Sequence, residues 1–325
     1  MNLTPESLSR EAAATGFAAE PLEKVFRLLA LLDALHSHPF LKTRIALKGG
    51  TALNLFHFDV PRLSVDIDLN YIGAADRETM LAERPKVEEA VQAVCSREGL
   101  ALRRMPPDHA GGKWRLAYTG TRGAPGNLEL DVNFMLRTPL WPCAAAECRP
   151  LGSLRSAPAR VLDLHELAAG KLAALLARSA SRDVFDARSL LNAPGLDPAR
   201  LRVGFVVYGG VNRKDWRTVS AADVQADPDE VRASLMPMLR RDLAPARREV
   251  AVWTERLVSE CRERLSVVLP LAEPEAEFLR RLNDDGEIAP ELLAADPAMQ
   301  AALREHPGLK WKALNVRRHR GLEAE

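Results

Sequence analysis

Two neighbouring stretches of the sequence are the most informative about its fold: KGGT at residues 48–51 and RLSVDIDL at residues 62–69. The first follows the short apolar run 45–47 and precedes residues 51–58, so it predicts a strand, a tight turn and a short helix. Two glycines let a backbone approach a ligand closely, and the amides of a helix N-terminus can hold phosphate oxygens. A Gly-Gly pair on its own is also typical of an ordinary turn.

The second stretch alternates apolar and polar residues, as a strand with one polar face does. Asp66 and Asp68 are two residues apart and therefore project from the same face. Their carboxylates can share one or two divalent cations. The same pattern also fits the solvated outer face of an edge strand.

A third stretch, NLELDVNF at residues 127–134, alternates in the same way. Glu129, Asp131 and Asn133 share one face, and the apolar residues share the other. If this strand lies beside the first acidic strand, it brings a third carboxylate to Asp66 and Asp68. Clustered carboxylates repel one another, and a bound metal removes that penalty.

The rest of the chain is organised around these stretches. Helices are expected at 21–36 and 77–98, and strands at 100–105, 114–118 and 128–134. Later residues favour helix, at 164–175, 228–241, 250–265, 275–282 and 298–304. The sequence therefore predicts an α+β protein. Residues 1–155 form a sheet flanked by helices, and residues 156–325 form a mostly helical domain.

Composition excludes little. The 325 residues contain 45 Lys and Arg against 44 Asp and Glu, so evidence for a nucleic-acid partner must come from local clusters. The first residues show no basic-then-apolar leader, and no apolar run is long enough for a membrane span. With only four cysteines as well, we expect a cytoplasmic protein with reduced thiols and no membrane partner.

Together, the three stretches resemble the polymerase-β-like nucleotidyltransferases, and among them the AbiEii/AbiGii group of toxins that includes the MenT toxins. KGGTALNLF and RLSVDIDL carry the specific part of the resemblance. Residues 166–175 (ELAAGKLAAL) and 178–186 (RSASRDVFD) look like the second motif block of that group. The resemblance implies transfer of a nucleoside monophosphate from an NTP, with Mg²⁺ or Mn²⁺ as the metal.

The resemblance also implies residue roles. The metal would be held by Asp66 and Asp68, with Asp131 as the third carboxylate and activator of the attacking hydroxyl, and with Glu129 as its fallback. Nucleotide binding would fall to Lys48, Gly49, Gly50, Thr51, Ser64, Lys171 and Arg182. Asp183 would position Lys171. In some relatives a serine in the position of Ser64 is phosphorylated.

One physical observation in the second half supports phosphate binding. In a continuous helix, Lys171, Arg178 and Arg182 would form one basic stripe. Long cations along an amphipathic helix also commonly form a plain solvated surface. Asp183 and Asp186, three residues apart, could pair with Arg182 or Arg178.

The resemblance further implies an RNA acceptor, in particular the 3′ end of tRNA, and a cognate antitoxin protein. Basic residues gather at 240–248 and 310–320, where Trp311 could stack on a base. Two alternatives stay open at this point. The acceptor could be a small molecule or a protein, or the chain could keep the fold and act by binding alone, which the intact Asp66/Asp68 pair argues against.

Overall fold

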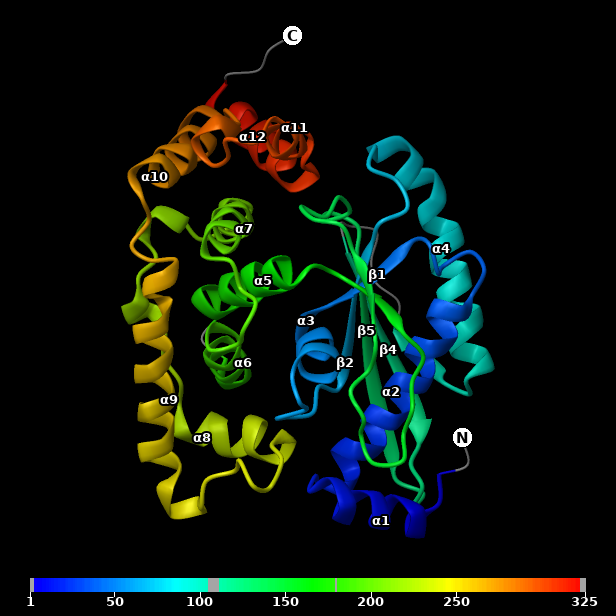
Figure 1. Cartoon of the computed structure of the whole chain (residues 1–325). Helices are drawn as coiled ribbons and strands as arrows, with labels where there is room; N and C mark the ends of the chain where they lie inside the picture. Colours follow the sequence, from blue (N-terminus) through cyan, green and yellow to red (C-terminus); the bar gives the residue numbers. More distant parts are fainter. Residues whose placement is uncertain (1–2, 105–110, 179, 322–325) are drawn as a thin grey trace. The chain divides into compact units, whose positions relative to one another are not determined.

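The computed structural model describes residues 3–104, 111–178 and 180–321 (Figure 1). The chain divides into two compact units. The first, here called the sheet unit, contains the residues up to Leu162 together with Ala233–Pro245. The second, the helical unit, contains Asp163–Arg232 and the residues from Ala246 onward. The mixture of a sheet with a mainly helical second half is the α+β architecture that the sequence predicts.

The sheet unit is built on a seven-stranded sheet with the order β3-β4-β5-β2-β1-β7-β6. Its strands are β1 Ile45–Lys48, β2 Asp66–Tyr71, β3 Ala101–Arg104, β4 Gly111–Thr119, β5 Pro125–Asn133, β6 Ala144–Ala146 and β7 Ala159–Val161. The pairs β2/β5 and β1/β7 are parallel, and the other neighbours are antiparallel. The expected strands 114–118 and 128–134 are β4 and β5. The expected strand 100–105 is β3, with residue 105 outside the described residues.

Helices α1 Pro5–Thr15, α2 Ala19–Ser37 and α4 Arg77–Arg97 belong to the sheet unit. In Figure 1, α2 and α4 lie on one side of the sheet and the short helix α3, Gly49–Ala52, lies on the other. The apolar stripe of α2 is fully buried, at Leu22, Val25, Leu28, Leu29, Leu31, Leu32 and Leu35. This stripe builds the core on one face of the sheet and leaves the opposite face for polar side chains.

The short helix predicted at 51–58 starts earlier and changes its winding. α3 covers Gly49–Ala52, and a π-helical turn follows at Leu53–His57. The side-chain amide of Asn54 donates to the carbonyl oxygen of Gly50 at 3.0 Å within this turn. Single π-helical turns of this kind occur frequently at functional sites.

The helix predicted at 228–241 is present only as far as Met238, and its winding changes along its length. α8 covers only Pro228–Glu230 and is followed by a π-turn at Val231–Leu235 and a 3₁₀ turn at Met236–Met238. Pro237 explains the break, since it lacks the N–H that a continuous helix needs. The segment then packs within the sheet unit, where the Leu63 amide donates to the carbonyl oxygen of Met238 at 2.8 Å.

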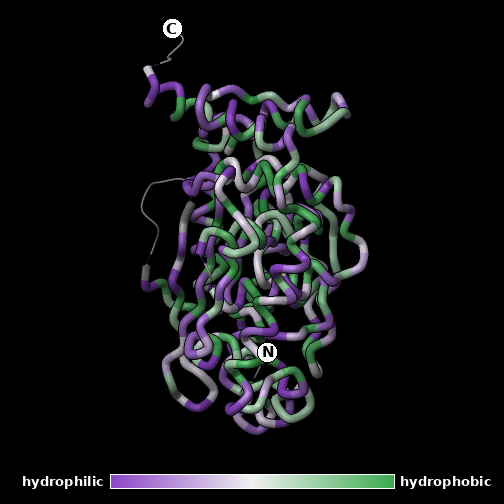
Figure 2. The backbone as a smooth tube through the Cα atoms, turned by 90° about the vertical axis from the view of Figure 1, so that its left-hand side faces the viewer, coloured by the Kyte–Doolittle hydropathy of each residue, from purple (hydrophilic) through white to green (hydrophobic). Residues whose placement is uncertain are grey.

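The helical unit contains seven longer helices among the described residues. They are α5 Leu164–Ala177, α6 Ser181–Leu191, α7 Pro198–Gly210, α9 Val250–Arg264, α10 Glu273–Arg280, α11 Pro297–Glu305 and α12 Pro307–Arg320. Four of the helices expected here are present as α5, α9, α10 and α11, and the basic residues noted at 310–320 belong to a further helix, α12. The last turn of α12 is hydrophilic (Figure 2). None of the helices in the described ranges combines the length and apolar character needed to cross a membrane.

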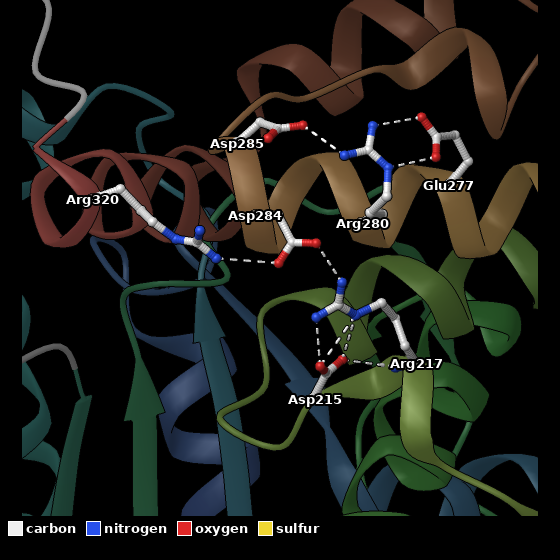
Figure 3. A network of polar contacts seen from close by, with 7 residues as sticks. All are labelled: Asp215, Arg217, Glu277, Arg280, Asp284, Asp285 and Arg320. Carbon is white, nitrogen blue, oxygen red and sulfur yellow. Dashed lines mark hydrogen bonds and ion pairs between the residues drawn. The ribbon is translucent and has the colours of Figure 1, made fainter.

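A network of ion pairs ties separate parts of the helical unit together (Figure 3). Arg217 lies 2.7 Å from Asp215 and 2.6 Å from Asp284, and Arg320 of α12 lies 3.4 Å from the same Asp284. Arg280 of α10 forms ion pairs with both Glu277 and Asp285. Part of the basic charge of α12 therefore serves packing within this unit.

Candidate active site

The candidate site is a row of charged residues that crosses four adjacent strands. Lys48 of β1 is paired in register with Asp68 of β2, and Asp68 with Asp131 of β5. Asp131 is paired in turn with Lys113 of β4. Register partners project from the same face of a sheet at a strand spacing of about 4.8 Å. The row therefore reads cation, carboxylate, carboxylate, cation.

A second row lies two residues away on the same face. Asp66 of β2 is paired with Glu129 of β5, and Glu129 with Arg115 of β4. The structure thus brings together Asp66, Asp68 and Asp131, as the alternation of the two acidic stretches predicts. We call this set of seven residues the charged face: Lys48, Asp66, Asp68, Lys113, Arg115, Glu129 and Asp131.

Gly49 sets the position of the Asp68 side chain. Its backbone has φ +72°, in the left-handed region that favours glycine. A Cβ placed on Gly49 would lie 2.2 Å from Oδ2 of Asp68. The carboxylate therefore occupies space that only a glycine at position 49 leaves open.

Gly50 and Thr51 are held by the segment that leads into β2. A Cβ on Gly50 would lie 3.0 Å from both Nη2 of Arg62 and Oγ of Ser64. The Thr51 hydroxyl is buried, lies 3.0 Å from Oγ of Ser64 and donates to the carbonyl oxygen of Asp66 at 2.5 Å. These contacts fix the start of β2 against the start of α3.

The two carboxylates of β5 have opposite electrostatic surroundings. Burial raises the pKa of Asp131, the Asp68 and Glu129 carboxylates add to the rise, and the charges of Lys48 and Lys113 oppose it. Glu129 has a lowered pKa because Lys113 and Arg115 donate to it, at 2.5 Å and 3.1 Å. Asp131 is therefore the better proton acceptor of the two, and Glu129 is neutralised by cations.

Sequence reasoning missed Lys113 and Arg115. Both are about half exposed and alternate along β4. The sequence pattern that could have pointed to them is the spacing of two cations, two residues apart in a predicted strand. That spacing becomes informative only when the β4/β5 register is known, because the register places them beside the acidic strand.

The fit of this face to a metal depends on its donors. Among residues 3–104, 111–178 and 180–321, no three His, Cys, Asp or Glu side chains are gathered so as to hold an ion. Mg²⁺ is usually held by one or two carboxylates together with substrate phosphates and water. Asp66 and Asp68, both half-buried on one face with Asp131 beside Asp68, supply donors of that kind.

In the helical unit, Lys171 lies in a buried ion-pair cluster. Its Nζ is 2.9 Å from Oδ1 of Asp183 and 2.9 Å from Oδ2 of Asp186. Arg178 adds a third contact, with its Nε 2.8 Å from Asp183. The side chains of Lys171, Asp183 and Asp186 are almost completely buried, so this is no solvated surface stripe. The expected proximity of Asp183 to Lys171 is present.

The helix does not continue from Lys171 to Arg182, so the basic stripe that a continuous helix would give does not form. α5 ends at Ala177, and Arg178 leaves helical geometry with φ −151°. Arg182 belongs to the first turn of the next helix, α6, and is half-buried. The break allows Asp183 and Asp186 to reach back to Lys171, whereas an unbroken helix would carry them away from it.

The basic residues near the end of the chain are partly used inside the helical unit. Lys310 lies 2.7 Å from Glu305, and Lys312 donates to the carbonyl oxygen of Asn212 at 3.2 Å. Trp311 is 46% exposed and so remains accessible for stacking.

Comparison with known proteins agrees with this architecture. The chain is similar to MenT4, a nucleotidyltransferase toxin from Mycobacterium tuberculosis H37Rv, with a TM-score of 0.60 and 19% sequence identity. The match covers 95% of this chain and 99% of that one, so the two share a fold. No curated protein matches the sequence.

Family membership follows from the sequence match. The family described as "Nucleotidyl transferase AbiEii toxin, Type IV TA system" matches residues 30–314, which include the charged face and the Lys171 cluster. Membership makes the protein a nucleotidyltransferase and implies a nucleotide substrate and an antitoxin partner. The chain belongs to the AbiEii family of nucleotidyltransferase toxins of type IV toxin–antitoxin systems.

Proposed function

We propose that the protein transfers a nucleoside monophosphate from an NTP to an RNA 3′ end, that of tRNA in particular, in a Mg²⁺-dependent reaction. One observation carries the proposal. The register of β1, β2 and β5 places Asp68 directly beside Asp131, with Asp66 on the same face and Gly49 against Asp68. This is a row of carboxylates next to a glycine turn at a helix N-terminus, which suits a metal-bound triphosphate.

The metal would be held by Asp66 and Asp68, with nucleotide phosphates completing its shell. When bound, Mg²⁺ (or Mn²⁺) supplies charge stabilisation for the α-phosphate and for the leaving pyrophosphate. The backbone N–H groups of Gly49 and Gly50, at the start of α3, would contact the phosphates, and Lys48 supplies a positive charge at the same end of the row. The buried hydroxyls of Thr51 and Ser64 shape this turn from within, so Thr51 would contribute its backbone N–H.

Asp131 would take the proton of the attacking hydroxyl. Its raised pKa makes it a better base than a free aspartate. The hydroxyl oxygen attacks the α-phosphorus in line, the bond from that phosphorus to the β-phosphate bridging oxygen breaks, and pyrophosphate leaves. Glu129, already neutralised by Lys113 and Arg115, would take no part in proton transfer.

The helical unit would contribute more indirectly. Lys171 is already neutralised by Asp183 and Asp186, so we assign Lys171 and Asp183 to positioning at the α5–α6 junction. Arg182, half-buried in the first turn of α6, would supply the phosphate contact of this unit.

An RNA acceptor is supported by the chemistry of its end. A 3′ terminus offers the hydroxyl nucleophile together with a chain of phosphates, and the protein displays cations close to the carboxylate row and on α12. A small-molecule or protein acceptor has no chain of phosphates and would not need these cations.

The acceptor can be identified directly. Purified protein is incubated with total RNA, a cell extract freed of RNA, and each of the four NTPs labelled in the α-phosphate, with Mg²⁺. The proposal predicts label in a product that ribonuclease destroys and protease does not. Label only in protein or in small molecules would replace RNA by that class of acceptor.

A further inference from the structure

Lys113 and Arg115 are the two cations of the charged face that lie on the β4 side of the carboxylates. Both alternate on β4, so they project from one face about 7 Å apart along the strand. Both contact the single carboxylate of Glu129, through its two oxygens. Two cations therefore share one partner, and both side chains are more than half exposed, at 55% and 54%.

The charge of the face depends on the metal. Four carboxylates (Asp66, Asp68, Glu129, Asp131) stand against three cations (Lys48, Lys113, Arg115), which leaves one net negative charge. A single Mg²⁺ on Asp66 and Asp68 would turn this into one net positive charge. The metal-loaded face would then attract a polyanion, with Lys113 and Arg115 as its most exposed cations.

Position along the row indicates which polyanion these cations would meet. The glycine turn lies at the β1 end, and Lys113 lies three strand spacings away, roughly 14 Å from Lys48 between Cα atoms. In-line transfer places the leaving pyrophosphate and the attacking hydroxyl on opposite sides of the α-phosphate. If the phosphates lie at the glycine turn, the acceptor lies toward β4.

We propose that Lys113 and Arg115, held in place by Glu129, bind backbone phosphates of the RNA acceptor on the side of the carboxylate row opposite to the nucleotide phosphates. The proposal rests on the proposed function, since it uses the in-line geometry of that reaction. Glu129 fixes the two long side chains as a pair, and each can exchange a carboxylate contact for a phosphate contact.

The test compares the double variant Lys113→Ala/Arg115→Ala with a control that loses the same two charges elsewhere. The exposed cations Lys86 and Arg97 of α4 provide that control, because α4 lies on the other side of the sheet from α3 (Figure 1). Binding of fluorescently labelled total tRNA is measured with Mg²⁺ over a range of salt concentrations. Binding of ATP, CTP, GTP and UTP is measured separately by calorimetry, and thermal unfolding reports folding.

For the β4 double variant, we expect tRNA affinity to fall about tenfold or more. The slope of log affinity against log salt concentration should decrease by the equivalent of about two phosphate contacts. NTP affinity should stay within about twofold, and the Lys86→Ala/Arg97→Ala control should bind tRNA like the wild type. Unchanged tRNA affinity in the β4 variant overturns the proposal. A loss of NTP affinity instead overturns it by assigning the cations to the nucleotide.

Measurements on the wild-type protein distinguish a failure of this inference from a failure of the proposed function on which it rests. If the wild type transfers label to RNA and the β4 variant binds tRNA equally well, the inference alone fails. If the wild type neither binds tRNA nor labels RNA, the proposed acceptor fails, and the inference fails with it.

Discussion

Oδ2 of Asp68 lies where the side chain of any residue other than glycine at position 49 would begin, since a Cβ on Gly49 would be 2.2 Å from that oxygen. We expect Gly49→Ala to displace the Asp68 carboxylate and to lower the transfer rate by about 100-fold or more. The positive φ should also cost about 1–2 kcal/mol of unfolding free energy. Transfer kinetics and chemical denaturation measure the two effects.

Gly99→Ala is the matched control for that change. Gly99 has φ +71°, almost the value of Gly49, and nothing lies within 4 Å of a Cβ placed there. It should show the same loss of stability with unchanged transfer. If both variants lose activity alike, backbone strain and not the Asp68 contact is responsible.

The third carboxylate can be identified by a pair of isosteric variants. We expect Asp131→Asn to lower the transfer rate by about 100-fold or more, because its raised pKa suits a general base. Glu129→Gln should lower it by about threefold at most, since Lys113 and Arg115 already neutralise that carboxylate. Single-turnover rates with saturating NTP measure both. The opposite ranking would move the catalytic role to Glu129.

Lys171 should matter for stability. Removing one partner of a buried ion pair leaves uncompensated charge, so Lys171→Ala should lower the unfolding free energy by about 3–5 kcal/mol. Arg178→Ala, which removes a cation that is 67% exposed from the same Asp183, should cost about 1 kcal/mol or less. Denaturant unfolding and NTP titration are run together. Lost NTP affinity without lost stability would show Lys171 to be a phosphate ligand.

Acid should weaken the same cluster. Burial raises the pKa of Asp183, but the charges of Lys171 and Arg178 outweigh it and hold that pKa below its ordinary value. A lowered folded pKa stabilises the protein above the unfolded pKa, about 3.9, and the contribution is lost as pH falls through the lower folded value. Asp183→Asn should therefore have a lower unfolding free energy than the wild type at pH 7. As the pH falls below about 4, its unfolding free energy should decrease less than that of the wild type. Parallel pH profiles for the two proteins would exclude this contribution.

Much of the sheet unit could be predicted from local pattern. The alternation around Asp66 and Asp68 and around Asp131 fixes which residues share a face, and the two strands pair in the register that places Asp68 beside Asp131. The glycine turn was recognisable from Gly49 and Gly50, because a short apolar strand leads directly into it.

What the sequence could not show depends on contacts between distant segments. The cations of β4 became part of the site only through the β4/β5 register. Pro237 breaks an otherwise helical pattern, and the return of Ala233–Pro245 to the sheet unit follows from packing alone. The burial of Lys171 required α5 to end at Ala177, for which no strong stop signal such as Gly or Pro is present.

Asp68→Asn is the decisive variant for metal-dependent transfer to RNA by the carboxylate row. The measurement is incorporation of α-phosphate-labelled NTP into RNA by the wild type and by Asp68→Asn across a Mg²⁺ titration, with thermal unfolding as the check on folding. We expect wild-type transfer to rise with Mg²⁺ and to stop in EDTA, and we expect the folded variant to transfer nothing at any Mg²⁺ concentration. Transfer by the folded variant at the wild-type rate, or transfer that persists in EDTA, would contradict this role of the carboxylate row.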